Sequence, residues 1–196
     1  SLGRLFRNAS LYGLGSFLVS IIGLAVDPLL SHKLSRADFG LLGLCASISG
    51  MLAASYTAGM DSAANRLYFD VEADPGARRR TVGTLNAFLL GWLTLLTVVQ
   101  EVFGPWIYAH LFDDLPYDPY GRLVAIALLL GGLGAIPRAL WAAREDVRQL
   151  VGLRVVSSLL AAVALVLLLL YTTLGPTGVL LSEIVAPALL IAAHLR

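Results

Sequence analysis

The chain has 196 residues and a mass of 20.8 kDa, a length that would suit one soluble domain. Its composition excludes that class, because 58% of the residues are hydrophobic, only 14% are charged and the mean hydropathy is +0.80. Soluble domains carry about 25% charged residues. The composition therefore predicts an integral membrane protein. A net charge of +1 indicates no particular partner, and no nucleic-acid partner is expected.

Six apolar blocks are long enough to cross a bilayer, which takes roughly 20 residues for a helix. Open sheet edges cannot exist in lipid, so the blocks predict an all-α fold. The expected spans are 10–31, 39–60, 82–103, 121–141, 151–173 and 177–194. The segment 103–120 is expected to be an acidic, aromatic loop, and 174–176 a tight turn. We expect residues 1–196 to form a single six-helix lobe.

Lys and Arg fall mainly on one side of these spans. With the N-terminus inside, the outer side holds only Lys33, Arg36 and Arg122, and the other 11 of the 14 basic residues lie inside. Cytoplasmic loops of membrane proteins carry an excess of Lys and Arg. The distribution therefore predicts a multi-pass protein whose N-terminus is cytoplasmic.

The first span carries a polar stripe beside an apolar face. At 3.6 residues per turn, the polar or small residues share one side. They are Tyr12, Ser16, Ser20, Gly23, Asp27 and Ser31. Such a stripe usually faces a bundle interior or a cavity, and an intramembrane carboxylate is a functional candidate. Asp27 is therefore expected either to line a transport cavity with Ser16 and Ser20, or to lie at the outer interface paired with Lys33 or Arg36.

Other spans add polar candidates. Asn86, Thr94, Thr97 and Glu101 share a face of the third span, so Asn86 is expected in the same cavity, although Thr side chains also hydrogen-bond their own helix. Asp61 and Arg66 are expected either at the inner mouth of this cavity or as ordinary interfacial residues. Glu183, four residues before Pro187, is a possible second acidic site.

Small residues and prolines have structural interpretations. Pro28 leaves the Leu24 carbonyl without its helical donor, which indicates either an opening for a substrate or a simple kink. The small residues of the second span predict close helix packing; they are Ala46, Gly50, Ala54 and Ala58. Gly131, Gly132, Gly134 and Pro137 indicate flexible close packing in the fourth span. Enzyme signatures, metal clusters and phosphate loops are missing from the sequence, so a transporter without a cofactor is expected.

Several motifs carry a resemblance to a known family. They are 8–16 (NASLYGLGS), 23–30 ending in Asp27-Pro28-Leu29-Leu30, 34–40 (LSRADFG), 59–69 (GMDSAANRLYF) and 133–145 (LGAIPRALWAARE). In this order and spacing, the chain resembles the N-terminal half of a bacterial polysaccharide (O-antigen type) flippase. These flippases form a branch of the multidrug/oligosaccharidyl-lipid/polysaccharide exporter superfamily.

The resemblance implies a function. It implies a two-lobed transporter in the bacterial cytoplasmic membrane whose lobes rock between inward-open and outward-open states. Its cargo is a lipid-linked oligosaccharide, and Asp27 fits the charged cavity position of the first helix. Val26 stands where the lipid II flippase branch tends to carry Arg, which argues against that substrate. The chain makes one lobe, so the second is expected on the same chain or on a partner.

Two alternatives share the same sequence features. One is a cation-coupled multidrug antiporter of the same superfamily, with Asp27 as its proton or sodium site. The other is a non-transporting membrane scaffold or assembly subunit.

Overall fold

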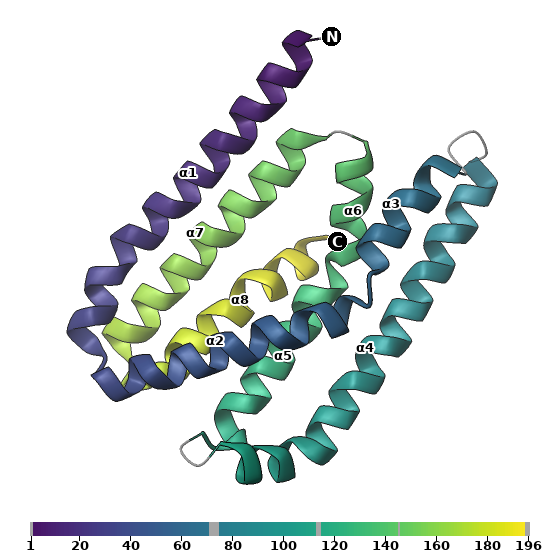
Figure 1. The fold of residues 1–196 in the computed structure, drawn as a ribbon. Helices are drawn as coiled ribbons and strands as arrows, with labels where there is room; N and C mark the ends of the chain where they lie inside the picture. Colours follow the sequence, from purple (N-terminus) through teal and green to yellow (C-terminus); the bar gives the residue numbers. More distant parts are fainter. Residues whose placement is uncertain (1, 71–74, 113–114, 145, 195–196) are drawn as a thin grey trace. The chain divides into compact units, whose positions relative to one another are not determined.

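The computed structural model describes residues 2–70, 75–112, 115–144 and 146–194, and every regular element in these ranges is helical. The predicted all-α class is therefore confirmed. The elements are α1 (Leu2–Lys33), α2 (Arg36–Thr57), α3 (Met60–Asp70), α4 (Pro75–Leu111), the short turn η1 (Tyr117–Gly121), α5 (Arg122–Leu133), α6 (Ala135–Ala143), α7 (Val147–Tyr171) and α8 (Pro176–His194) (Figure 1).

Five stretches of the described chain are long and apolar enough to cross a membrane, which makes the chain a multi-pass membrane protein. They are Asn8–Lys33, Arg36–Leu67, Arg79–Leu111, Tyr117–Ala143 and Val147–Tyr171. They correspond to the first five expected spans. The sixth is present as α8, whose described apolar part, Pro176–Leu189, is shorter.

Two expected loops are partly helical. α4 continues to Leu111, so the prediction that 103–111 belongs to a loop is wrong. The connection before α4 is also shorter than expected, because α3 extends to Asp70 and α4 starts at Pro75. Proline suits the first position of a helix, where its missing N–H would have no partner in any case.

The chain divides into two compact units, of which the first comprises Ser1–Leu34 and Trp141–Arg196. In this unit α7 packs against both α1 and α8 (Figure 1). Gly15 is buried at the contact of α1 with α7, and a Cβ there would overlap Val151. A residue without a side chain thus allows the two helices to approach closely. The predicted turn before α8 is confirmed, with Gly175 at a φ of 53°.

The second unit comprises Ser35–Leu140. Its first helix starts at a capping box, in which the Asp38 N–H donates to Ser35 Oγ (3.2 Å) and the Ser35 N–H donates to Asp38 Oδ2 (2.8 Å). The core joins α2, α3, α4 and α6. Its buried members are Tyr56, Ala64, Leu89, Leu93, Ala135, Ile136 and Ala139.

The small residues of α2 were predicted to allow close helix packing, but within this unit no described helix packs against them. Ala46, Gly50, Ala54 and Ala58 are exposed, and a Cβ on Gly50 would meet open space. Helical periodicity places them opposite Cys45, Leu52 and Tyr56, through which α2 contacts its neighbours. Gly132, by contrast, packs closely as predicted, because a Cβ there would lie 2.6 Å from Leu93 Cδ2.

Replacing Gly15 by Leu tests the close contact of α1 with α7. The added side chain would overlap Val151, so we expect destabilisation by about 1–3 kcal/mol, the usual cost of overpacking. Gly13→Leu is the matched control, because open space surrounds Gly13. Thermal unfolding in detergent measures both. Equal melting temperatures for the two variants would contradict the contact.

Candidate functional site

α1 presents three distinct faces along its length. Leu11, Gly15, Val19, Ile22 and Val26 are buried or half-buried, on the face that meets α7. With steps of about 100° per residue, the polar stripe lies roughly a quarter-turn to one side of this face. The apolar residues Leu14, Phe17, Leu18, Ile21 and Leu24 are exposed on the other side. The stripe and the apolar face therefore point in different directions, and the described helices of the same unit cover neither.

The stripe's hydroxyl groups are anchored to their own helix. Ser20 Oγ donates to the Ser16 carbonyl (3.0 Å), and Ser31 Oγ donates to the Pro28 carbonyl (2.8 Å). Each hydroxyl has one donor and two acceptor lone pairs. Since the donor is used within the helix, these exposed oxygens offer acceptor positions to a ligand.

Asp27 is exposed on the same stripe, immediately before Pro28. Among the described residues of its unit, including Lys33, it forms no ion pair. The pairing with Lys33, one of the two partners expected for an interfacial Asp27, is therefore not made; Arg36, the other, belongs to the second unit. Pro28 has no N–H, which removes the helical donor of the Leu24 carbonyl one turn before it.

The predicted site residues are divided between the two units. Asp27, Ser16, Ser20 and the exposed Glu183 of α8 belong to the first. Asn86, Asp61 and Arg66 belong to the second. Asn86 is half-buried on α4, where its Nδ2 donates to the Val82 carbonyl (3.0 Å). Arg66 is exposed on α3, and the side chain of Asp61 lies outside the described residues. Their assembly into one cavity stays a prediction.

Polar residues of α4 make contacts that the sequence did not predict. Tyr56 Oη donates to Gln100 Oε1 (2.7 Å), and Gln100 Nε2 donates to the Gly121 carbonyl (3.4 Å). These bonds connect α2, α4 and the end of η1. The only sequence signal was a glutamine inside an apolar span.

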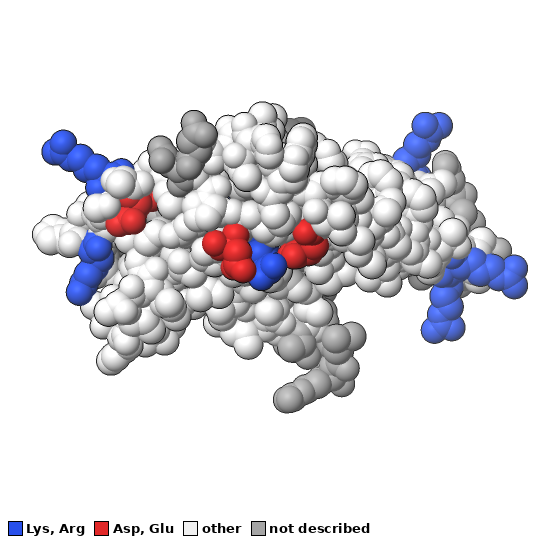
Figure 2. Space-filling view, turned by 90° about the horizontal axis from the view of Figure 1, so that it is seen from below, with Lys and Arg blue, Asp and Glu red and all other residues white. Residues whose placement is uncertain are grey.

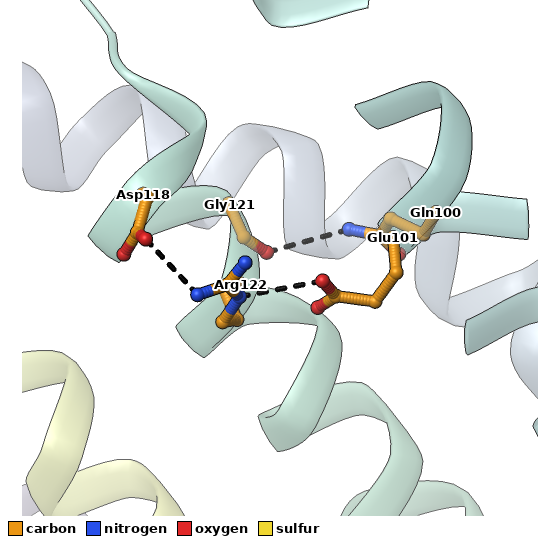
Figure 3. Close-up of polar contacts among 5 residues, drawn as sticks. All are labelled: Gln100, Glu101, Asp118, Gly121 and Arg122. Atoms are coloured by element: carbon orange, nitrogen blue, oxygen red, sulfur yellow. Dashed lines mark hydrogen bonds and ion pairs between the residues drawn. The ribbon is translucent and has the colours of Figure 1, made fainter. Parts of the chain in front are cut away.

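A charged cluster lies beside this network, made of Glu101, Asp118 and Arg122. Arg122 lies between the two carboxylates, with Nε 3.3 Å from Glu101 Oε2 and Nη1 3.0 Å from Asp118 Oδ2 (Figure 3). All three side chains are at least a third exposed, so each pair contributes little to stability. The cluster marks the place where the start of α5 lies near α4. Elsewhere charges are sparse, and most of the face drawn in Figure 2 is uncharged.

Comparison with known proteins gives a family. Residues 29–195 match the family model described as "Polysaccharide biosynthesis protein". The chain belongs to this polysaccharide biosynthesis family. The match confirms the predicted resemblance to polysaccharide flippases of the exporter superfamily.

Two curated relatives are the Lipid III flippases of Escherichia coli (strain K12) and Shigella flexneri. Each is 29% identical to the present chain over 185 residues, which is 94% of this chain and 44% of the relative. The chain thus spans less than half the length of these flippases. No solved structure gives a significant match.

Tyr56→Phe tests the hydrogen bond between α2 and α4. It removes the donor of Gln100 Oε1 in a buried position, so we expect a loss of about 0.5–1.5 kcal/mol in unfolding free energy. Tyr171→Phe is the control, since Tyr171 is 81% exposed. Denaturant titration in mixed micelles measures both variants. A Tyr56→Phe protein as stable as the control would show that the bond is absent in the membrane protein.

Proposed function

We propose that this chain forms the N-terminal lobe of a flippase that moves a lipid-linked oligosaccharide across the bacterial cytoplasmic membrane. The observation that carries the proposal is the exposed polar stripe of α1, with Asp27 in it, on an otherwise apolar span. Membership of the polysaccharide biosynthesis family and the likeness to two Lipid III flippases support it. The protein acts as a transporter and not as an enzyme.

The two exposed sides of α1 match the two halves of such a cargo. A saccharide head group is rich in hydroxyl groups, which hydrocarbon cannot hydrogen-bond. Asp27 accepts hydrogen bonds from these hydroxyls, and the oxygens of Ser16 and Ser20 supply further acceptors. The lipid tail stays in the bilayer, where the apolar side of α1 faces it. One helix therefore separates a polar path from the lipid.

The remaining candidates extend this path. Asn86 lines the cavity, Asp61 and Arg66 flank its inner mouth, and Glu183 supplies a second acidic position. Arg66 gives the inner mouth a positive charge, which suits the phosphate groups that link sugar to lipid in carriers of this kind. A second six-helix lobe, on the same chain or a partner, encloses the cavity, and alternating access exposes it to each side in turn.

The orientation follows from the basic residues. With the six expected spans, 11 of the 14 Lys and Arg residues fall on the side of the N-terminus. We therefore place the N-terminus, Arg66 and the loop before α4 in the cytoplasm. The charged cluster of Glu101, Asp118 and Arg122 then lies on the outer side.

Asp27→Asn in the full-length protein tests the role of the carboxylate. Hydrogen bonds to a charged group contribute about 1.5–3 kcal/mol, so we expect saccharide export to fall roughly tenfold or more. Export is measured as surface polysaccharide in cells whose own copy is deleted. Asp118→Asn is the control, because its carboxylate is exposed but lies off the stripe. Unchanged export by Asp27→Asn at normal protein levels would overturn the assignment.

Ser20→Leu tests the stripe independently of charge. It makes the middle of the polar path apolar, and we expect export to fall while the protein inserts normally. Ser47→Leu is a close match, because Ser47 is also exposed on a spanning helix and also donates to the carbonyl four residues before it. An equal effect of the two substitutions would show that the stripe has no special role.

A further inference from the structure

α7 carries an arginine well inside its membrane span. Arg154 lies seven residues after the first residue of Val147–Tyr171, which is about 10 Å along the helix at 1.5 Å per residue. A centred helix of 25 residues extends beyond a hydrocarbon core of roughly 30 Å by only about 4 Å at each end. The backbone of Arg154 therefore lies about 6 Å inside the hydrocarbon.

The guanidinium of Arg154 has no partner in its own unit. Its side chain is exposed, and it makes no hydrogen bond or ion pair with the described residues of the first unit. A guanidinium has five N–H donors and stays charged at every physiological pH. Charged residues within spans almost always face a bundle interior or a water-filled cavity, and they mark substrate pathways. Arg154 is therefore a candidate for binding an anion.

Arg154 projects away from the apolar side of α7. The exposed apolar residues of this helix all lie within about 40° of the direction opposite to Arg154, at 100° per residue; they are Val156, Leu159, Val163, Leu167 and Leu170. Ser157, one turn after Arg154, lies on the same flank, and its Oγ donates to the Leu153 carbonyl (2.7 Å). α7 therefore has an apolar side and a polar flank, as α1 does.

The polar flank of α7 and the polar stripe of α1 lie on the same side of this helix pair. The two helices pack together and run in the same direction (Figure 1). Ser16 of the stripe lies about 100° around α1 from the contact residue Gly15, in the direction of increasing residue number. Arg154 lies about 60° around α7 from the contact residue Val151, in the opposite direction. On parallel helices that face each other, these opposite rotations lead to the same side.

Arg154 is also level with the stripe. Measured along the helix axes from the contact of Gly15 with α7, Arg154 lies about 4.5 Å further on. Ser16 and Ser20 lie about 1.5 Å and 7.5 Å beyond the same contact, on either side of this level. Asp27 lies about 18 Å beyond it, which is too far for an ion pair with Arg154. A cation and a carboxylate thus follow one another along one polar surface.

We propose that Arg154 binds the phosphate or diphosphate group that joins the saccharide to its lipid in the cargo. The inference rests on the proposed function and adds an anion site to its polar path. A guanidinium binds phosphate oxygens through two parallel hydrogen bonds, which fixes the orientation of the group. The saccharide hydroxyls then extend toward Ser20 and Asp27. The negative charge of Asp27 repels a phosphate, so the two ends of the polar part of the cargo are distinguished.

The depth of Arg154 favours the cargo over the head group of a surrounding phospholipid. The head groups of bilayer lipids lie in the interfacial layers, outside the hydrocarbon core. α7 begins on the side of the N-terminus, so in the proposed orientation Arg154 lies in the cytoplasmic half of the span. A phosphate bound there has left the head-group layer of the inner leaflet, which is the first part of its crossing.

The test is equilibrium binding of a fluorescent polyprenyl diphosphate to the full-length protein in phosphatidylcholine nanodiscs. Arg154→Gln removes the charge, and we expect its affinity to fall roughly tenfold or more, because a charge-assisted bidentate contact is lost. Affinity for a polyprenol, which has no phosphate, is expected to stay the same. Arg148→Gln is the matched control, since Arg148 is also exposed on α7 but lies in its first turn, about 120° around the helix from Arg154.

A conservative pair of variants covers the case in which Arg154→Gln does not fold. Lysine keeps the charge but cannot make the bidentate contact, so Arg154→Lys is expected to bind the diphosphate with intermediate affinity. Arg148→Lys is expected to bind it like the wild type. Equal affinities of the variants at the two positions would overturn the assignment of Arg154.

Phosphatidylglycerol in the nanodiscs distinguishes the two sources of phosphate. We expect the difference between the wild type and Arg154→Gln to persist when phosphatidylglycerol is present in excess over the probe. Loss of the difference would show that Arg154 binds bilayer head groups, and would overturn the proposal while the proposed function stands. A wild-type protein that binds no polyprenyl diphosphate at all would contradict the proposed function as well.

Discussion

The structure depends on satisfying backbone carbonyls inside hydrocarbon, where an unpaired one costs several kcal/mol. Within a helix, each carbonyl accepts a hydrogen bond from the N–H four residues later, so carbonyls lose their partners only where the helix breaks. α2 stops at Ala58 and Gly59, both with positive φ, so the Ser55 carbonyl loses its helical donor. The indole Nε1 of Trp92 on α4 donates to it instead, at 2.8 Å. At the break between α5 and α6, Arg138 Nη2 donates to the Gly131 carbonyl at 2.8 Å. Two long side chains thus make interrupted spans tolerable in lipid.

Most of the fold was predictable, because apolar length alone identifies spans in a bilayer. The predicted ends were less accurate for a physical reason. Residues 103–111 include Trp106, Tyr108 and His110, whose polar side-chain groups suggested a loop outside the hydrocarbon core. They stay helical because aromatic residues are also at home at the membrane interface. The break at Gly134 was signalled by Gly and Pro nearby, and the break at Ala58 is followed by Gly59, but the φ of 47° at Ala58 itself is unusual for a residue with a side chain and could not be expected from the sequence.

The candidate site was also predictable in part, where its features belong to one helix, and not where they depend on contacts between helices. The stripe of α1 could be found from the sequence because it is a property of one helix, and helical periodicity fixes it. The contacts of Tyr56 with Gln100 and of Glu101 with Arg122 join residues 44 and 21 positions apart. They depend on how one helix is rotated against another, which periodicity does not specify. The same limit explains the small residues of α2, whose spacing showed a face suited to close packing but not whether a neighbour lies against it.

The length of α4 has a mechanical consequence. Its 37 residues extend over about 55 Å, far more than the roughly 30 Å of a hydrocarbon core. Such a helix must lean steeply, or project into the head-group layers, or do both. Each adjustment depends on how thick the surrounding membrane is. The thickness of the bilayer, which is set by the length of the lipid chains, therefore influences the tilt of α4. This helix carries Gln100, Glu101 and Trp92, whose indole N–H donates to the Ser55 carbonyl of α2.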